Sequence, residues 1–355
     1  LHLMKHYFLL IGFLLGIFSA QAAFATQIAG LYQAEVDSAT SGNEWQRQAL
    51  AQVLVRVSGK AEVTELPQVK AELAKAASYV KQFENVRQAG GNRMRVLLDA
   101  EKVNQLLQQQ GIAVWGALRP DTLIWLVEQN GSERQFIRQS SHPVNAAMQQ
   151  AFRQAALPLT LPLYDMDDLL SLSETDVWAG FWQPVEQASS RYSADVVIIA
   201  SIEKQSTDGK EQLRLNWQRQ ADGKTLRDEI TATDETALMR QFAVVLAAQL
   251  SDRYASVLSA GRGAQFTLQV RQLGNLTDIV QVQRLLQQVV GVSQVTVSSY
   301  HAGIAHYALQ AAISGDGLLN ALRFNKQLQL VPANDAVALN EQPLPTLATY
   351  RYLRP

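Results

Sequence analysis

The chain has 355 residues, of which 47 % are hydrophobic and 18 % are charged, a composition typical of folded rather than disordered proteins. The formal net charge is −1 and the lysines and arginines are dispersed. This argues against nucleic acid or anionic lipid as the main partner, because both require a concentrated basic surface. The absence of cysteine excludes disulfides, thiol chemistry and a lipid-modified N-terminal cysteine.

The N-terminal stretch has the pattern of a secretory signal. A short basic start precedes an apolar run from Tyr7 to Phe18, and "AFA" at residues 23–25 matches the small-x-small pattern of signal peptidase sites. The run of about a dozen residues is shorter than the roughly 20 that a spanning helix needs. We predict a signal peptide over 1–25, a mature chain that starts near Thr26 in the periplasm, and no transmembrane segment after cleavage. A retained N-terminal anchor is the alternative.

Residues 26–118 are predicted to form a first, α+β unit. "IAGLYQAEV" alternates at period two, as a strand does, and "EWQRQALAQVLVRVSG" predicts an amphipathic helix that ends at Gly59. A second helix follows, then two strands that turn near Gly90-Gly91 and a helix capped by Asp99. The order β-α-α-β-β-α resembles a split β-α-β sandwich with one added helix.

The stretch "GIAVWGALRPDTLIWLV" leads from the first unit into the second. Pro120 restricts Arg119 to extended geometry and cannot donate a sheet hydrogen bond. We therefore predict that Trp115, Arg119, Pro120 and Trp125 form a hinge or joint, with the tryptophans packed on either side. A ligand-stacking or interaction role for the tryptophans is the alternative.

Residues 119–258 are predicted to form a central α/β domain. "TLIWLVE" and "ADVVIIASI" are apolar at nearly every position, as expected of strands that are buried on both faces. A helix over "HPVNAAMQQAFRQAALPL" lies between them, and antiparallel strands that turn at Asp222-Gly223 follow. A long helix over 237–258 closes the domain. The order indicates a mixed sheet with helices on both faces.

After a linker over 259–263, residues 264–332 are predicted to form a third unit. Strand, helix, a hairpin around Ala302-Gly303, helix and strand give the β-α-β-β-α-β order of a ferredoxin-like unit. The proline-containing tail over 333–355 is predicted to be irregular. The expected fold is thus a multidomain α+β and α/β chain in which two ferredoxin-like units flank a central α/β domain.

Motifs for catalysis or cofactor binding are absent from the sequence. There is no G-x-S-x-G nucleophile elbow, phosphate-binding loop or dinucleotide fingerprint. His301 and His306 flank a predicted hairpin turn, but a metal site would need a third ligand, and none is evident. We therefore predict no cofactor, no metal site and no enzymatic activity.

The strongest acidic pattern is "YDMDD", which contains Asp165, Asp167 and Asp168. Paired carboxylates can bind a hard cation or serve in acid–base catalysis. Helix capping or solvation explains the same residues without chemistry. Arg191 precedes a buried strand, and we expect it to pair with an acid at a helix end, with an anion contact as the alternative.

Three segments carry a resemblance to a known family: "QALAQVLVRVSGK", "RVLLDAEKVNQLLQQQGIAVWGALRPDTLIWLV" and "RYSADVVIIASIE". They resemble the uncharacterised bacterial family called domain of unknown function 2066. The resemblance implies no assigned activity, so it brings no catalytic residues. The central segment is also similar in layout to small α/β domains of envelope accessory proteins, which is an analogy of fold and licenses no function.

The leading hypothesis is a non-enzymatic periplasmic protein that binds another component of the cell envelope. A metal-assisted periplasmic hydrolase centred on Asp165, Asp167 and Asp168 is the main alternative. A solute-binding protein with two lobes hinged at Arg119-Pro120 is a third, and it predicts a large cleft at that joint.

Overall fold

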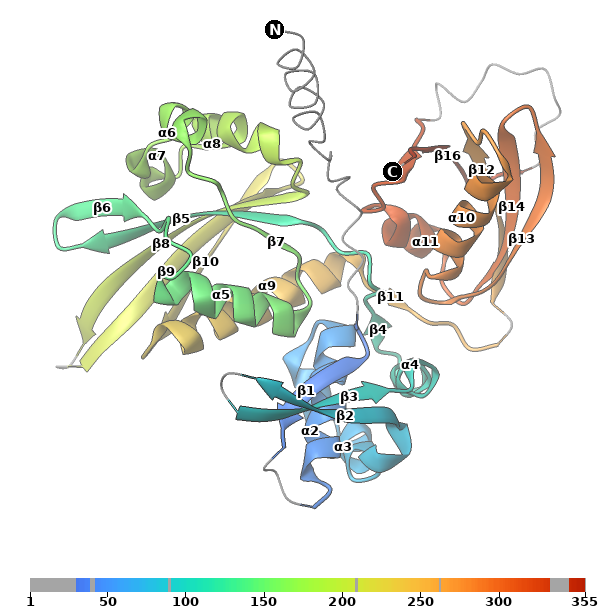
Figure 1. Cartoon of the computed structure of the whole chain (residues 1–355), viewed down its shortest axis with the longest axis horizontal. Coiled ribbons are helices and arrows are strands. Elements are labelled where there is room, and N and C mark those ends of the chain that lie inside the picture. Colours follow the sequence, from blue (N-terminus) through green and yellow to red (C-terminus); the bar gives the residue numbers. More distant parts are fainter. Residues whose placement is uncertain are drawn as a thin grey trace, which may run out of the picture.

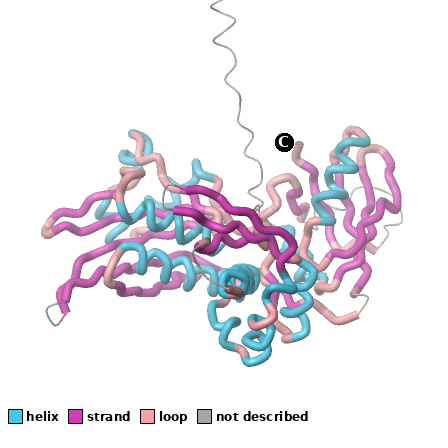
Figure 2. Tube along the Cα trace, turned by 60° about the horizontal axis from the view of Figure 1, so that its bottom comes forward, coloured by secondary structure: helices cyan, strands magenta, loops and turns pink. Residues whose placement is uncertain are grey.

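The chain folds into three groups of strands and helices, coloured blue to teal, green to yellow, and orange to red along the sequence (Figure 1). Figure 2 shows the strands in magenta with helices in cyan packed against them. The predicted signal peptide lies outside the described residues. The computed structural model describes residues 30–38, 42–88, 91–207, 210–261, 263–332 and 345–354.

The first unit is a three-stranded antiparallel sheet with the order β1-β3-β2, packed against helix α2. The apolar face of α2 is fully buried, and the helix ends where Gly59 adopts a left-handed φ of 74°. Asp99 caps α4 as predicted, by accepting from the backbone N–H groups of Glu101 and Lys102. The elements are β1 (Gln33–Asp37), α2 (Glu44–Ser58), the 3₁₀ helix η1 (Ala61–Glu65), α3 (Pro67–Leu73), η2 (Ala76–Tyr79), β2 (Val80–Gln88), β3 (Gly91–Leu98) and α4 (Ala100–Gln109).

A fourth strand does not join this sheet. The chain leaves the first unit through β4 (Ala113–Val114), which pairs antiparallel with β11 (Ser256–Val257) at the exit of the central unit. The two short strands form a sheet of their own. The first unit therefore contains the β-α-β-β-α part of the predicted arrangement, and the complete ferredoxin-like arrangement is not confirmed there.

The central unit is a mixed sheet covered by helices on both faces. Its order is β10-β9-β8-β5-β6, with β7 also paired to β5; β5 is parallel to β8 and β7, and the other pairs are antiparallel. One hydrophobic cluster joins the sheet to α5 and α9, and a second joins it to α7 and α8. The elements are β5 (Thr122–Asn130), β6 (Glu133–Phe136), α5 (Pro143–Ala155), β7 (Leu159–Thr160), α6 (Met166–Ser171), α7 (Glu174–Ala179), α8 (Trp182–Ser189), the 3₁₀ helix η3 (Ser190–Tyr192), β8 (Val196–Thr207), β9 (Lys210–Ala221), β10 (Lys224–Ala232) and α9 (Glu235–Tyr254).

The third unit differs from two predictions, the ferredoxin-like strand order and the irregular tail. Its sheet has the order β13-β14-β12-β16-β15, in which β16 is parallel to β12. The predicted last strand, β15, therefore does not lie beside β12, and the ferredoxin-like order is not confirmed. The elements are β12 (Ala264–Arg271), α10 (Leu276–Gln287), β13 (Val292–His301), β14 (Ile304–Ala311), α11 (Gly315–Leu322), β15 (Leu328–Leu330) and β16 (Ala348–Tyr352).

Strand β16 comes from the tail that we predicted to be irregular. The prolines at 343 and 345 suggested an irregular extension, but "ATYRY" after them is rich in aromatic and β-branched residues. Tyr350 and Tyr352 are buried in the sheet. The tail prediction was wrong for these residues because their β propensity and buried area outweigh the effect of the nearby prolines.

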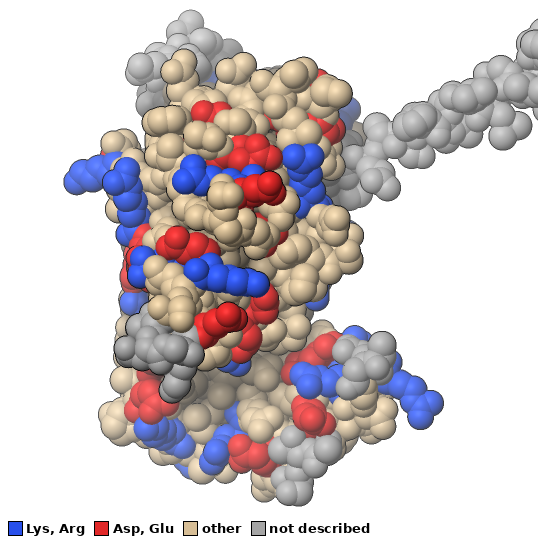
Figure 3. Space-filling model, turned by 90° about the vertical axis from the view of Figure 1, so that its left-hand side faces the viewer, with Lys and Arg blue, Asp and Glu red and all other residues tan. Residues whose placement is uncertain are grey.

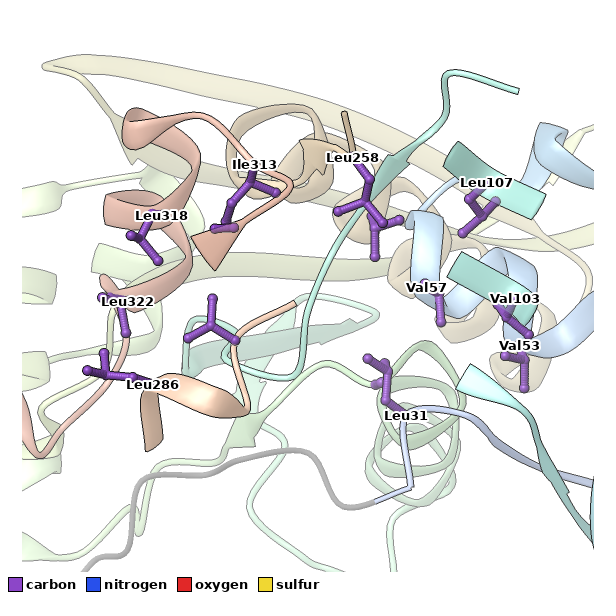
Figure 4. Packing of buried hydrophobic residues seen from close by; sticks show 14 of the residues in the cluster. Leu31, Val53, Val57, Val103, Leu107, Leu258, Leu286, Ile313, Leu318 and Leu322 are labelled. Carbon is purple, nitrogen blue, oxygen red and sulfur yellow. The ribbon is translucent and has the colours of Figure 1, made fainter. Parts of the chain in front are cut away.

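The first and third units share one hydrophobic cluster across the joint. Figure 4 shows Leu258, which follows β11, between Val57 and Leu107 of the first unit and Ile313 of the third. Trp115 belongs instead to the cluster of the central unit. The segment around β4 and β11 is thus the place where all three units meet.

Candidate functional site

Arg119 is buried at this meeting point and donates all of its side-chain hydrogen bonds to backbone carbonyls. Only 3 % of the residue is exposed. Its Nε donates to Gly116 (3.0 Å), Nη1 to Ala155 (2.9 Å) and Ala156 (3.2 Å), and Nη2 to Arg56 (2.6 Å) and Trp115 (3.1 Å). A guanidinium has five N–H donors, so none of them is left without an acceptor.

These carbonyls explain why a charge is tolerated there. The carbonyls of Arg56 and Ala155 lie in the last turns of α2 and α5. Carbonyls at the end of a helix lack intrahelical partners and carry partial negative charge. Burial, with a smaller effect from nearby Arg56, lowers the pKa of Arg119 to about 9, which leaves it charged at neutral pH. Arg119 therefore ties the first unit to the central one.

Both predicted tryptophans are buried, as expected of a packed joint. Trp115 is 1 % exposed, its ring lies 4.0 Å from the Arg119 guanidinium, and its backbone N–H donates to Val57 (2.7 Å). Trp125 is fully buried within β5, and its Nε1 donates to Ser189 Oγ (2.9 Å). Neither ring presents a face to solvent, so the ligand-stacking alternative is wrong. A hinge motion at Arg119-Pro120 stays a prediction.

The space beside Trp115 at the joint is small. The hollow between Trp115, Leu118, Tyr254 and Val289 has a volume of about 20 Å³. That is room for about one water molecule. The larger space between the first and central units is a groove on another side of the joint, lined by Arg56 and Ala155, and the two-lobed solute-binding alternative stays a hypothesis.

The acidic cluster has a structural explanation. Asp165 caps α6 and forms two hydrogen bonds with Arg191 (2.7 and 3.0 Å), which holds the pKa of the Asp165 carboxyl below its usual range. Asp168 is 1 % exposed and accepts hydrogen bonds from Arg191, Tyr192 and the Tyr164 N–H. Asp167 is 81 % exposed. The acids therefore hold α6 against the segment that contains Arg191, as expected for that arginine.

Asp168→Ala should be strongly destabilising, whereas Asp167→Ala should have little effect. The first change leaves a buried N–H and phenol without an acceptor and removes a carboxylate partner of Arg191. Losing a buried charged partner typically lowers the free energy of unfolding by about 3–5 kcal/mol. A substitution at an exposed position typically changes it by no more than about 0.5 kcal/mol. Urea unfolding of both variants measures the difference. Equal stability of the two would contradict the structural role and reopen the hydrolase alternative.

His301 and His306 lie in the neighbouring strands β13 and β14. His306 lies in β14, and its Nδ1 and Nε2 are hydrogen-bonded to Ser299 Oγ (2.9 Å) and Gln269 Nε2 (3.2 Å). His301 lies at the end of β13. Among the described residues, no three His, Asp or Glu side chains are grouped so that they could hold a metal ion.

A groove of about 450 Å³ lies between the first and central units. Helix α2 supplies one wall and helices α5 and α9 supply the other. The two walls meet at Gly59, where a side chain would lie only 2.4 Å from Ser251 Cβ. The lining is mostly small and apolar, and includes Ala51, Val55, Ala155, Ala243, Val244 and Ala247.

Three arginines line this groove and give it an unbalanced positive charge. Arg56 donates to the carbonyls of Gln154 (2.9 Å), Gly30 and Gln33, and Arg93 donates to the carbonyl of Glu35 (3.2 Å). Arg240 lies on α9. Within the described ranges, none of the three lies within ion-pair distance of a carboxylate, although Arg240 acts on Asp234 from farther away. The one acid in the lining, Glu35, is bonded to Arg95 (3.2 Å) and also acts electrostatically on Arg56.

This local charge differs from the rest of the visible surface. On the face in Figure 3, basic and acidic side chains are interspersed. The groove is not evident in the sequence because its residues come from β1, α2, β3, α5 and α9, which are far apart in the chain. One signal was present: Phe242 to Ala248 is continuously apolar, although an amphipathic helix needs apolar residues on one face only.

Comparison with known proteins gives one match. Residues 25–116 match the family described as Domain of unknown function (DUF8605). An uncharacterised family was expected, but it is not the domain of unknown function 2066 that the sequence resembled. No curated protein and no solved structure matches the chain. None of the described helices has the length and apolar character required to cross a bilayer.

Proposed function

We propose that the protein is an exported, non-enzymatic binding module for another component of the cell envelope, and that the α2–α5–α9 groove is its binding surface. Export to the periplasm is inferred from the signal-like pattern over residues 1–25. The groove is supported as the binding surface by the combination of apolar lining and positive charge.

The observation that carries this proposal is the excess of basic over acidic side chains in the groove, which is lined by Arg56, Arg93 and Arg240 and by one acid, Glu35. Arginine is also enriched at protein interfaces, where its flat guanidinium binds carboxylates with two hydrogen bonds. A groove with apolar walls and unpaired arginines is therefore complementary to an apolar ligand that carries negative charge.

The geometry favours binding over hydrolysis for these residues. The alternative reaction would need Asp165, Asp167 and Asp168 to converge on a substrate. Instead, the three acids surround Arg191: Asp165 and Asp168 bind it directly, and the exposed carboxylate of Asp167 lies 3.9 Å from it. No observation on the described residues supports the hydrolase over the binding module.

Photo-crosslinking in the native envelope tests the choice of surface. A photoreactive residue at Val244 should give a discrete crosslinked adduct because Val244 lines the groove. The same residue at exposed Arg284 of α10 is a matched control and should give none. Position Met166 tests a rival surface, since Met166 is 70 % exposed on α6 beside exposed Leu163 and Leu170. An adduct from Met166 and none from Val244 would show that the groove was wrongly chosen.

A further inference from the structure

We infer that the occupant of the groove is an acidic amphipathic helix of a partner protein, laid along α2. This inference rests on the proposed function and names the class of partner. It follows from the length of the groove, the size of its lining side chains and the position of its unpaired charges.

The groove continues along the whole of α2. A second hollow of about 460 Å³ shares Ala51 and Thr64 with the first and is lined by Glu44, Arg47 and Gln48. The combined trough therefore runs from Glu44 to Gly59. The 15 residues of α2 correspond to a length of about 22 Å. A trough of this length fits a helix of about four turns.

The small lining residues permit close approach of such a helix. Alanine and valine at 51, 55, 155, 243, 244 and 247 leave room that larger side chains would fill. Packed helices lie about 8–10 Å apart, depending on the side chains at the contact. Docking of an amphipathic helix by its apolar face into a hydrophobic groove is a general mode of peptide recognition.

The charges determine the end at which the acids of the partner should lie. At the Glu44 end of the trough, the lining charges pair with each other: Arg47 with Glu44 (3.2 Å) and Lys70 with Glu65 (2.7 Å). At the α9 end, Arg56, Arg93 and Arg240 have no such partners among the described residues. The carboxylates of the bound helix should therefore meet the arginines there, beside the apolar contact.

A labelled probe peptide tests this inference on the full mature chain. The probe is a capped helix of about 15 residues, with Leu and Ala on one face and Glu beside it. Fluorescence anisotropy should show saturable binding of this probe. Replacing Glu by Gln in the probe should weaken binding about tenfold, and a Pro that interrupts its helix should abolish binding. Arg240→Glu and Arg93→Glu should each weaken binding about tenfold, while Arg284→Glu on α10 of the third unit should not.

A groove-filling variant separates packing from charge. Ala51→Trp places a large ring between the two hollows and should abolish binding while the circular dichroism spectrum is unchanged. If this variant fails to fold, the charge reversals at exposed Arg240 and half-buried Arg93 decide the question. Binding by the Pro-interrupted peptide as tight as by the helix would overturn the helical occupant.

Other outcomes distinguish this inference from the proposed function. If dodecanoate binds in the groove and the helical probe does not, the occupant is a single-chain amphiphile and the inference is overturned. If Val244 forms an envelope adduct but no probe helix binds, the inference fails and the binding function stands. If there is neither adduct nor probe binding, both fail.

Discussion

Arg119→Ala should lower stability more than any surface substitution in this protein. It removes five hydrogen bonds and the stacking on Trp115, and it leaves carbonyls of α2 and α5 buried without donors. A buried acceptor left without its donor typically costs about 1–3 kcal/mol, so several of them should together cost about 3–5 kcal/mol of the roughly 5–15 kcal/mol that stabilises a domain. The melting temperature should fall by roughly 6–20 °C in calorimetry.

Two further variants isolate the cause. Arg119→Lys keeps the charge but offers three donors in place of a flat array of five, so its loss should be intermediate. Arg134→Ala is the matched control, because Arg134 also stacks on a tryptophan, Trp178, at 4.4 Å but is exposed. Its cost should stay near 0.5–1 kcal/mol, roughly that of an exposed cation–π contact. If Arg119→Ala were as stable as this control, the joint would not depend on Arg119.

Trp125→Ala should have an effect of similar size for a different reason. The ring lies between the sheet and α8, with edge contacts to Tyr164 (5.6 Å) and Tyr192 (5.9 Å), and it is fully buried. Truncating a buried tryptophan typically costs about 3–5 kcal/mol through lost contacts and the cavity left behind. Chemical denaturation of the variant measures this cost directly.

Ser189→Ala and Phe181→Ala serve as its controls. Ser189→Ala removes only the hydrogen bond from Trp125 Nε1 and should cost about 1 kcal/mol. Phe181 is an aromatic residue that is 55 % exposed, so its truncation should cost much less than that of Trp125. If Trp125→Ala left stability unchanged but removed partner binding, Trp125 would act in recognition and not in packing.

Trp115 illustrates what position in the sequence does and does not reveal. Trp115 is 1 % exposed and packed against Arg119, so its truncation should cost about as much as that of Trp125, about 3–5 kcal/mol. The stacking of Arg119 on Trp115 cannot be deduced from the neighbouring residues in the sequence, because the carbonyls that bind Arg119 lie in α2 and α5.

Much of the secondary structure followed from local patterns. The helix that ends at Gly59, the cap at Asp99 and the hairpin at Ala302-Gly303 were predicted because capping and turn geometry depend on neighbouring residues. The place of β16 was not predicted, because strand order depends on contacts between Thr349 and residues some 80 positions earlier, such as Gln269. The same limit applies to β4, whose partner β11 follows the whole central unit.

The groove could not be predicted for the same reason. Arg56, Arg93 and Arg240 are ordinary charged residues in the sequence, each on a different element. Their excess over the single acid of the groove becomes evident only when α2 and α9 are brought together at Gly59 and Ser251. The acidic residues at 165, 167 and 168 were conspicuous in sequence because they are adjacent, yet their carboxylates serve capping and pairing with Arg191.

The most direct test of the central claim is the yield of the envelope adduct from Val244 in two backgrounds. One is the otherwise unaltered chain, and the other carries Arg93→Glu and Arg240→Glu together, with folding verified by its melting temperature. We predict a discrete adduct in the first and its loss in the second, because the bound component requires the unpaired arginines. An adduct of equal yield in the folded double variant would contradict the account.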